Sequence, residues 1–590
     1  MRSRFVHRCI FTSLLVSGTT AFSLRAEMSV ALESSAPPPV PVGTVVTFWP
    51  SVLDANPGTL WYRYRVRDFD SGFRAIRDYG PVVLLDWTAS EHEGTYEIEV
   101  SVRNRDTGET ATASALFEMT SRLEGDAPVI SPTAHPLVFL YSAPPCLDGG
   151  RMRVEFQSLD GVVQQTPYKP CDPGRSMNFY LAGMRPESPY AVRHTVDAGS
   201  DSFAGPQLEL TTPEASVPMP EYAVAQPPPG PIVNGILLQG PVAGSVVATD
   251  LRGNLLWSYA GGITSFTRAE PGGYFLGVGQ DPTADQSYQF VREFDLAGTT
   301  IAETNAARVS EQLAALGRRG ITAFHHEARR LPDGKLLVLA STEQIMTDVQ
   351  GSGPVDVLGD MVLVLDQDLN VTWVWDAFDH LDPYRTAILG EVCAQVGGGC
   401  PAFYLAARAN DWLHGNSLQL APDGNIVLSI RHQDWVIKID YRNGEGDGRV
   451  LWRLGKDGDF RMIDNDPWPW FSHQHDAQFD AEDPSILRVF DNGNTRYAGD
   501  PAARSRGQVL QLDEQNRTAK LVLNADLGAY SFALGSAQKL PNGNHHFDVG
   551  ILSGSKSQSV EVDRAGNTVY SLHISVPVYR SFRVRDLYTP

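Results

Sequence analysis

The chain has 590 residues, more than one ordinary hydrophobic core organises, so we expect several domains. Its 53 glycines and 40 prolines, with few long amphipathic segments, indicate a turn-rich, all-β protein. The formal net charge of −21 argues against nucleic acid or an anionic membrane surface as a partner, and any anionic substrate must therefore meet a local basic pocket.

Residues 1–26 predict an export signal. Three arginines precede a mostly apolar stretch from Cys9 to Leu24, and Leu24-Arg25-Ala26 offers a cleavage site. Serine and threonine interrupt this stretch, which is short for a membrane span, so we favour a cleaved signal over a retained anchor. No later stretch is long and apolar enough to cross a bilayer. We therefore expect a periplasmic or secreted protein with no stable membrane insertion.

Four cysteines remain once Cys9 leaves with the signal. An even number in an exported protein favours disulfides, and three pairings are open. The local pairing joins Cys146 to Cys171 and Cys393 to Cys400.

Two regions with short alternating runs follow the signal, over residues 27–125 and 126–212. Several short strands with turn-rich spacers predict an immunoglobulin-like β-sandwich for the first region and a fibronectin-like β-sandwich for the second. The strands that we expect are Thr44–Phe48, Leu60–Val66, Thr95–Val102, Met152–Phe156 and Pro189–His194. Neither region holds a catalytic constellation, so we interpret both as scaffold or docking modules.

Residues 213–231 contain seven prolines and predict a semi-rigid interdomain linker.

The chain repeats over residues 232–590. One signature is an apolar strand that ends in Asp, a turn rich in Gly or Asn, and a second strand. Its copies end in Asp250, Asp295, Asp366, Asp440, Asp513 and Asp563. Turns such as Pro422-Asp423-Gly424 precede most copies, so each unit has four strands. Six such units predict a six-bladed β-propeller that carries the chemistry, and we expect Tyr579–Val584 to close its ring.

One hairpin, over residues 411–433, carries potentially catalytic side chains. Its two strands are joined by a turn from Pro422 to Asn425, whose composition supplies the positive φ angles that a tight hairpin needs. The hairpin therefore places His414 and Arg431 at the same end of the strand pair. The insertion Asp379–Ala409 should lie on one face of the propeller.

Histidines mark the first strands of several units. The first strand of every propeller blade lines the central channel, so these distant side chains are expected to converge at one channel mouth. They are His325, His326, His414, His473 and His475. Arg431 adds a permanent charge, and Trp412, Trp468 and Trp470 are candidates for an aromatic wall.

Four motifs in these units resemble those of bacterial arylsulfate sulfotransferases. They are Phe324-His325-His326-Glu327, Leu413-His414-Gly415-Asn416-Ser417, Ser429-Ile430-Arg431-His432-Gln433 and Gln474-His475-Asp476-Ala477. The resemblance covers about residues 230–590 and implies a six-bladed propeller with an N-terminal β domain, exported to the periplasm and independent of the phosphoadenosine cofactor. It also implies a disulfide loop near the site, for which Cys393 and Cys400 are candidates, and a homodimer. The second N-terminal sandwich departs from the family.

The resemblance implies that His475 is the nucleophile and becomes a transient sulfohistidine. Arg431 and His414, with His325 or His326, would bind the sulfuryl oxygens and the phenolic leaving oxygen of an aryl sulfate donor, before transfer to a phenolic acceptor. Asn416 and Trp412 are expected at the substrate.

Which of the paired histidines acts is open, and we favour His326 as the catalytic one and His325 as a substrate contact. Alignment of His326-Glu327-Ala328 with His475-Asp476-Ala477 favours His326, whereas alignment with His414 across a one-residue gap favours His325.

Elementary chemistry supports such a set. Sulfuryl transfer resembles phosphoryl transfer, in which catalysis is mainly positioning and stabilisation of developing charge. Neutral imidazole is a good nucleophile, and the planar guanidinium of arginine suits tetrahedral oxyanions. No glycine-rich nucleotide loop is present, so we expect no cofactor.

Two rival functions remain open. One is a metal enzyme with His325, His326, His414 and His475 as zinc or copper ligands. The other is a surface adhesion or carbohydrate-binding propeller without enzymatic activity. We interpret the remaining histidines of these motifs and of the last unit as structural; they are His432, His473, His545, His546 and His573.

Overall fold

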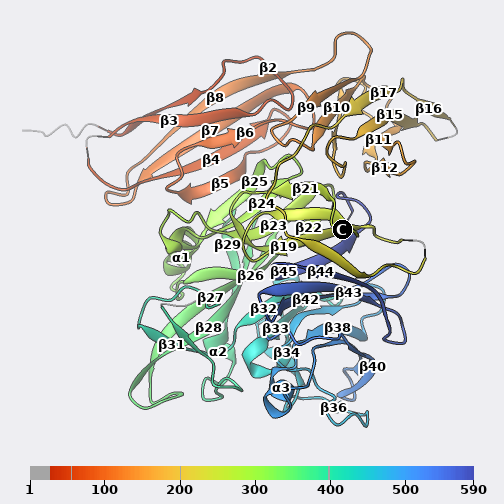
Figure 1. Cartoon of the computed structure of the whole chain (residues 1–590). Coiled ribbons are helices and arrows are strands. Elements are labelled where there is room, and N and C mark those ends of the chain that lie inside the picture. Colours follow the sequence, from red (N-terminus) through yellow and green to blue (C-terminus); the bar gives the residue numbers. More distant parts are fainter. Residues whose placement is uncertain (1–26, 55, 200, 231, 396–398, 590) are drawn as a thin grey trace, which may run out of the picture.

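The computed structural model describes residues 27–589 except 55, 200, 231 and 396–398, and the predicted export signal lies outside the described residues. Half of the residues are in strands and 5% in helices, so the prediction of an all-β protein is confirmed. The two N-terminal units lie across the top of a larger C-terminal assembly in the view of Figure 1. Among the described residues, no helix is both long and apolar enough to span a membrane.

The first N-terminal unit packs two sheets against each other. One sheet has the order β1-β3-β6 and the other contains β2-β8-β7-β4-β5. Alternate residues of β7, namely Ile98, Val100 and Val102, are fully buried between them, because successive side chains of a strand point to opposite faces. The bounds are Ser29–Ser34 (β1), Val40–Pro41 (β2), Val46–Leu53 (β3), Leu60–Asp68 (β4), Arg74–Gly80 (β5), Leu85–Trp87 (β6), Gly94–Asn104 (β7) and Thr110–Thr120 (β8).

The second unit also has two sheets, β9-β10-β14 and one centred on β11 and β15. The Cys146–Cys171 disulfide joins the ends of this unit's loops, as the local pairing predicts. The bounds are Val129–Pro132 (β9), Phe139–Ala143 (β10), Arg151–Ser158 (β11), Val163–Gln165 (β12), Lys169–Pro170 (β13), Met177–Leu181 (β14), Pro189–Asp197 (β15), Ser202–Ala204 (β16) and Leu208–Thr211 (β17).

The predicted linker differs from expectation in one respect. Tyr222–Gln226 forms strand β18, which pairs antiparallel with β44 and so extends one sheet of the C-terminal assembly. Main-chain hydrogen bonds therefore anchor the segment over the five residues of β18.

Six groups of four antiparallel strands make up the C-terminal assembly. The first two groups are Ile236–Pro241 (β19), Val246–Asp250 (β20) and Leu255–Tyr259 (β21) with Val578–Val584 (β45), and Ile263–Glu270 (β22), Tyr274–Gly279 (β23), Phe290–Asp295 (β24) and Thr300–Asn305 (β25). The third and fourth are Ala323–Arg330 (β26), Leu336–Thr347 (β27), Pro354–Leu365 (β28) and Val371–Asp376 (β29), and Gly415–Leu420 (β32), Ile426–Ile430 (β33), Trp435–Ile439 (β34) and Val450–Gly455 (β35). The fifth and sixth are His475–Phe479 (β37), Ile486–Asp491 (β38), Arg506–Asp513 (β39) and Thr518–Asp526 (β40), and Ser536–Lys539 (β41), His545–Leu552 (β42), Lys556–Val562 (β43) and Thr568–Ile574 (β44).

The innermost strands of these groups lie next to one another. Strand β22 contacts β26, β26 contacts β32, β32 contacts β37, β37 contacts β41, and β41 contacts β45, which in turn contacts β22. Because β45 pairs with β19, the end of the assembly is hydrogen-bonded to its beginning. The predicted hairpin is present as β32 and β33, with Gly424 at a φ of 79° in its turn.

The remaining elements are short and lie in the connections. They are Ala306–Ala315 (α1), Ala377–His380 (α2), Asn494–Gly499 (α3), Val392–Ala394 (β30), Arg408–Asp411 (β31), Arg461–Met462 (β36) and the 3-10 turns Gln286–Tyr288 (η1), Arg431–Gln433 (η2) and Arg442–Gly444 (η3). Strands β30 and β31 come from the predicted insertion and extend the sheet of β28.

Candidate active site

Three neighbouring inner strands bring their histidines together. His325 and His326 lie near the start of β26, His414 directly precedes β32, and His475 is the first residue of β37. The ring centroids of His326 and His414 are 4.9 Å apart, and those of His325 and His414 are 6.4 Å apart. The predicted convergence of these residues therefore has a geometric basis in equivalent ends of adjacent strands.

Backbone irregularities set the direction of these side chains. His326 and His414 have φ angles of 59° and 54°, and Asp476, which follows His475, has 52°. The strand register shifts around His326 and Asp476, and just after His414, between Gly415 and Ser417. Such bulges re-aim side chains and are common beside active sites. His326 and His414 are thus equivalent in backbone conformation. The two sequence alignments differ from this, because one pairs His326 with His475 and the other pairs His325 with His414.

Hydrogen bonds settle which nitrogen of His475 carries the proton. The side-chain amide of Asn492 donates to the carbonyl oxygens of Ser531 at 2.9 Å and Leu534 at 3.1 Å. Its Oδ1, 2.7 Å from His475 Nδ1, must therefore accept a hydrogen bond from that nitrogen. Nε2 is left with its lone pair and accepts a long hydrogen bond of 3.2 Å from the Leu534 amide.

His475 is held in the neutral form. Burial lowers its pKa well below the ordinary value, and the positive charges of Arg431 and Arg580 lower it further. A neutral imidazole with an unprotonated Nε2 is the form that attacks an electrophile.

His414 is oriented by a buried carboxylate. Its Nδ1 lies 2.7 Å from Asp411 Oδ2, so Nδ1–H donates and Nε2 is presented to the site. Burial of Asp411 opposes its ionisation, but the nearby His414 and His432 outweigh burial and hold the pKa of Asp411 well below its usual range.

Arg431 lies in η2 and is fixed from two sides. Its Nη2 donates to the carbonyl oxygen of Phe532 at 2.8 Å, and its Nη1 donates to His432 Nε2. His432 donates from Nδ1 to the carbonyl oxygen of Asp411 at 2.7 Å. Burial lowers the pKa of His432 to about 3, so this histidine is a neutral acceptor for the guanidinium.

The C-terminal strand β45 contributes two further side chains. Tyr579 donates its hydroxyl hydrogen to the carbonyl oxygen of His326 at 2.8 Å, and the two rings are 5.6 Å apart. Buried Arg580 donates to Glu327 at 2.9 Å and to the carbonyl oxygen of Asn416 at 2.6 Å. Both residues brace the backbone of the histidine-bearing strands.

His326 is the paired histidine whose ring faces His414. Its Nδ1 lies 2.8 Å from Nδ1 of His325, and the Nε2 of His325 is 3.2 Å from Asp360 Oδ1. Burial, followed by the charges of His414 and His325, lowers the pKa of His326 well below its ordinary value.

Two predicted substrate contacts have other roles in this structure. Asn416 is fully buried and donates its amide hydrogen to the carbonyl oxygen of Gln474 at 2.7 Å. Trp412 is 1% exposed and donates its indole N–H to the carbonyl oxygen of Arg385. Neither has free surface at the histidines, because Asn416 joins two inner strands and Trp412 is a core residue. Of the other candidate wall residues, Trp468 is half exposed and Trp470 packs against the core.

The histidines interpreted as structural have partners in the protein or lie away from the site. His473 lies between Glu391 and Asp434; burial opposes its charge, but these two carboxylates outweigh burial and raise its pKa. His546 lies 2.9 Å from Ser581 Oγ, and His573 is exposed on β44.

The second disulfide reaches the site. Cys393 is bonded to Cys400, as the local pairing predicts, and Cys393 Sγ lies 3.5 Å from Asp411 Oδ2. The bridge therefore lies on β30 beside the carboxylate of β31 that orients His414.

Two groups of possible metal ligands occur in the part of the chain that the structure describes: Cys393, Cys400 and Asp411, and Asp411, His414 and His432. The first group contains a disulfide. In the second, both nitrogens of His432 are engaged in hydrogen bonds. Only His414 is shared with the quartet of the metal hypothesis.

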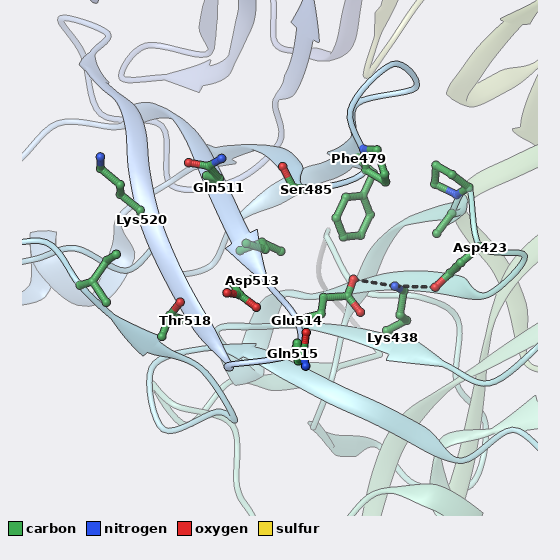
Figure 2. Close-up of a pocket in the computed structure, with 15 residues that line it drawn as sticks. Asp423, Lys438, Phe479, Ser485, Gln511, Asp513, Glu514, Gln515, Thr518 and Lys520 are labelled. Carbon is green, nitrogen blue, oxygen red and sulfur yellow. Dashed lines mark hydrogen bonds and ion pairs between the residues drawn. The ribbon is translucent and has the colours of Figure 1, made fainter.

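A cavity of about 760 Å³ lies at the far end of the β32–β33 hairpin, around the turn that contains Asp423 (Figure 2). No histidine lines it. Lys438 Nζ lies 2.7 Å from both Asp423 and Glu514, so its charge is matched within the protein.

Sequence reasoning missed four residues that organise the site: Asp411, Asn492, Tyr579 and Arg580. Asn492 follows β38 in a polar turn that carries no periodic signal. Tyr579 and Arg580 lie in the segment that we expect to close the ring. That expectation is the sequence signal that could have placed them beside the inner strands.

Comparisons with known proteins agree with the motifs. Residues 222–580 match the model of the Arylsulfotransferase (ASST) family. Arylsulfate sulfotransferase AssT of Escherichia coli O6:H1 is 25% identical over 42% of this chain and 47% of its own length. AssT of Lelliottia amnigena is 25% identical over 48% of this chain and 54% of its own length.

The chain thus spans about half the length of these curated relatives. Solved structures of chicken interferon gamma receptor alpha chain and of three fibronectin domains of chicken CNTN1 match with TM-scores of 0.13 and 0.14 at 9% identity, covering 31% and 59% of this chain and 97% of each of theirs. Likenesses at these scores say nothing about the fold. Because the family model covers more than half of the residues, the chain belongs to the arylsulfotransferase family.

Proposed function

We propose that this protein is an arylsulfate sulfotransferase that moves a sulfuryl group from an aryl sulfate ester to a phenolic acceptor without a nucleotide cofactor. The observation that carries the proposal is the hydrogen bonding of His475: Asn492 accepts from its Nδ1–H and leaves Nε2 unprotonated, while burial and the charge of Arg431 lower its pKa. Family membership supports the same activity.

The proposed scaffold is a closed six-bladed propeller over residues 232–590, preceded by an immunoglobulin-like sandwich over 27–125 and a fibronectin-like sandwich over 126–212, with 213–231 between them. The ring of contacts between inner strands and the pairing of β45 with β19 support the propeller. Export to the periplasm or beyond, after removal of residues 1–26, accords with two disulfides. A homodimer is part of the proposal by family analogy alone.

The reaction proceeds in two halves. In the first, the Nε2 lone pair of His475 attacks sulfur, an N–S bond forms, and the bond from sulfur to the aryl oxygen breaks with its electron pair going to the phenolate. His414 supplies the proton to that oxygen, since burial keeps His326 neutral. Arg431 binds the sulfuryl oxygens, whose charge is spread in a loose transition state.

In the second half, the acceptor phenol gives its proton to His414 and its oxygen attacks sulfur. The N–S bond breaks and its electron pair returns to Nε2. Throughout, Nδ1–H of His475 donates to Asn492, so no proton has to move within the nucleophile.

Replacement of the nucleophile tests the proposal. His475→Ala should abolish release of a chromogenic phenol from its sulfate ester, because no other described group takes the place of Nε2, while circular dichroism stays unchanged. Brief exposure of the wild type to the donor without acceptor should leave one added sulfuryl group on the peptide that contains His475, measured by mass spectrometry.

His573→Ala, a change to an exposed histidine on β44, is the matched control and should keep full activity. Equal turnover by wild type and His475→Ala would contradict the proposal. Turnover that requires a stoichiometric bound metal, and is lost on chelation and regained on its return, would favour the metal enzyme instead.

A further inference from the structure

A second cavity, of about 360 Å³, lies where the six inner strands end. Each of the strands β22, β26, β32, β37, β41 and β45 contributes at least one residue to its lining. The histidines lie at the opposite ends of the same strands. On β26, for example, His326 and Arg330 are four residues apart, which is roughly 13 Å along an extended chain.

The lining of this cavity is dominated by cations. Five basic side chains and one carboxylate, that of Glu270, line it; the basic residues are Arg268, Arg329, Arg330, Arg488 and Lys539. The protein as a whole carries a net charge of −21, so a cavity lined mainly by basic side chains contrasts with its overall acidity.

Most of these cations form a close ion pair with a carboxylate of the protein. Arg330 pairs with Glu293, and Arg488 and Lys539 lie 2.7 and 3.0 Å from Asp480.

Arg329 is the exception. Its nearest carboxylate, Glu327, is 3.8 Å away and lies closer to Arg580, at 2.9 Å, and to Arg268, at 3.3 Å. Burial and the neighbouring Arg268 lower the pKa of Arg329 to about 10, which is the response of an undercompensated cation.

Several buried hydrogen-bond donors at this cavity also lack partners. The Nε–H groups of Arg268, Arg329 and Arg488 are buried and have no hydrogen-bond partner among the described residues. Among the described residues, no basic nitrogen lies within 4 Å of the Glu270 carboxylate oxygens, and burial raises the pKa of Glu270. Buried donors without partners are costly, and a bound acceptor removes that cost.

We propose that this cavity is a second anion site, which binds a small oxyanion with sulfate, phosphate or carboxylate groups. Arginine guanidinium groups and these groups form charge-assisted, often bidentate hydrogen bonds. The site is separate from the histidines, because the buried ion pairs of Arg580 with Glu327 and of Arg268 with Asp476 lie between them. The inference does not depend on the proposed reaction.

Thermal unfolding with added inorganic sulfate tests the site, because a ligand that binds only the folded state raises Tm by mass action. Sodium chloride at matched ionic strength controls for screening. The wild type and Arg431→Gln, which is changed only at the histidine end, should both show a Tm that rises with sulfate. Arg329→Gln should need at least about tenfold more sulfate for the same rise, since a charge-assisted contact is lost.

A second variant keeps the test decisive if Arg329→Gln folds poorly. Glu270→Gln removes the competing carboxylate and should shift the sulfate response to lower concentration. Arg252→Gln, the same charge change as in Arg329→Gln at an exposed turn, is the matched control and should respond like the wild type. Parallel titrations with phosphate and with citrate distinguish an inorganic oxyanion from an organic carboxylate as the preferred ligand.

Three outcomes would overturn the inference: an unchanged response in both Arg329→Gln and Glu270→Gln, a response to chloride equal to that to sulfate, or loss of the response in Arg431→Gln alone. Loss of turnover in His475→Ala has no bearing on these measurements, so the two proposals fail separately.

Discussion

At the scale of single residues, the chemistry depends on which nitrogen of each imidazole is protonated. Asn492 fixes this for His475 and Asp411 fixes it for His414, in each case through Nδ1. The orienting group is thus as important as the histidine, a pattern that recurs wherever an imidazole acts as base or nucleophile.

Asn492→Ala should lower kcat by about 10²-fold with little change in KM, because His475, the proposed nucleophile, loses the acceptor that keeps Nε2 unprotonated. Steady-state rates across pH provide the check. A merely structural role would lower the yield of folded protein and leave kcat per folded molecule and its pH profile as they are in the wild type.

Arg431→Lys should lower kcat/KM by on the order of 10²-fold or more. Lysine keeps the charge but lacks the planar fork, and it cannot reach the Phe532 carbonyl oxygen and His432 at once. The measurement is initial rate with a chromogenic aryl sulfate. Near-normal turnover would mean that only net charge matters at this position. Arg252→Lys serves as the matched control.

At the scale of elements, the bulged inner strands and the inserted β30–β31 segment determine the site. The bulges turn His326 and His414 toward each other, and the Cys393–Cys400 bridge holds β30 beside Asp411. The other disulfide, Cys146–Cys171, closes a longer loop in the second N-terminal unit.

The two disulfides should therefore have different effects when removed by paired Cys→Ala changes. Loss of Cys146–Cys171 should cost more stability, since chain-entropy reasoning gives about 3.5 kcal/mol for its loop and about 2.5 kcal/mol for the shorter one. Loss of Cys393–Cys400 should cost more activity, because Asp411 loses a neighbour. Denaturant unfolding and turnover of both variants provide the comparison, and the reverse order in either measurement would contradict it.

The strands and the hairpin were largely predictable from the sequence, whereas the bulges were not. The Asp-ending repeats predicted four-stranded units, and the Pro422–Asn425 turn predicted the β32–β33 hairpin, because both signals are local. The bulges were not predictable, since positive φ at His326 or His414 depends on neighbouring strands and not on residue type. The burial of Asn416 and Trp412 was not predictable either, because a motif does not reveal which side of a strand faces the core.

At the scale of the whole molecule, many titratable groups are buried in the C-terminal assembly. Burial lowers the pKa of His432 and His546 to about 3 and that of His545 to about 4. His473 is shifted the other way, because Glu391 and Asp434 raise its pKa.

The sign of the resulting pH dependence follows from these directions. Below pH 6.5 the unfolded chain binds protons at His432, His545 and His546 that the folded chain does not, so stability should fall as pH drops from 6.5 toward 4. Each of the three contributes up to about 1.4 kcal/mol per pH unit. His473 opposes this, since its contribution is full below pH 6.5 and lost as pH rises through its folded pKa.

Guanidinium unfolding at pH 7 and pH 5 should therefore show the lower free energy of unfolding at pH 5. His546→Gln should reduce the difference, because one titrating group is removed. A protein equally stable at both pH values would show that these histidines titrate normally in the folded state.

The pairing of the last strand with β19 has a consequence for biosynthesis. Tyr579 and Arg580 brace the histidine-bearing strands from β45, whose partner β19 lies at the opposite end of the C-terminal assembly in sequence. A chain that is still being synthesised and has not reached residue 584, or one that stops before residue 578, lacks the strand that supplies them. The sheet that contains β19 therefore stays incomplete, and the histidine-bearing strands stay unbraced, until residues 578–584 have been made.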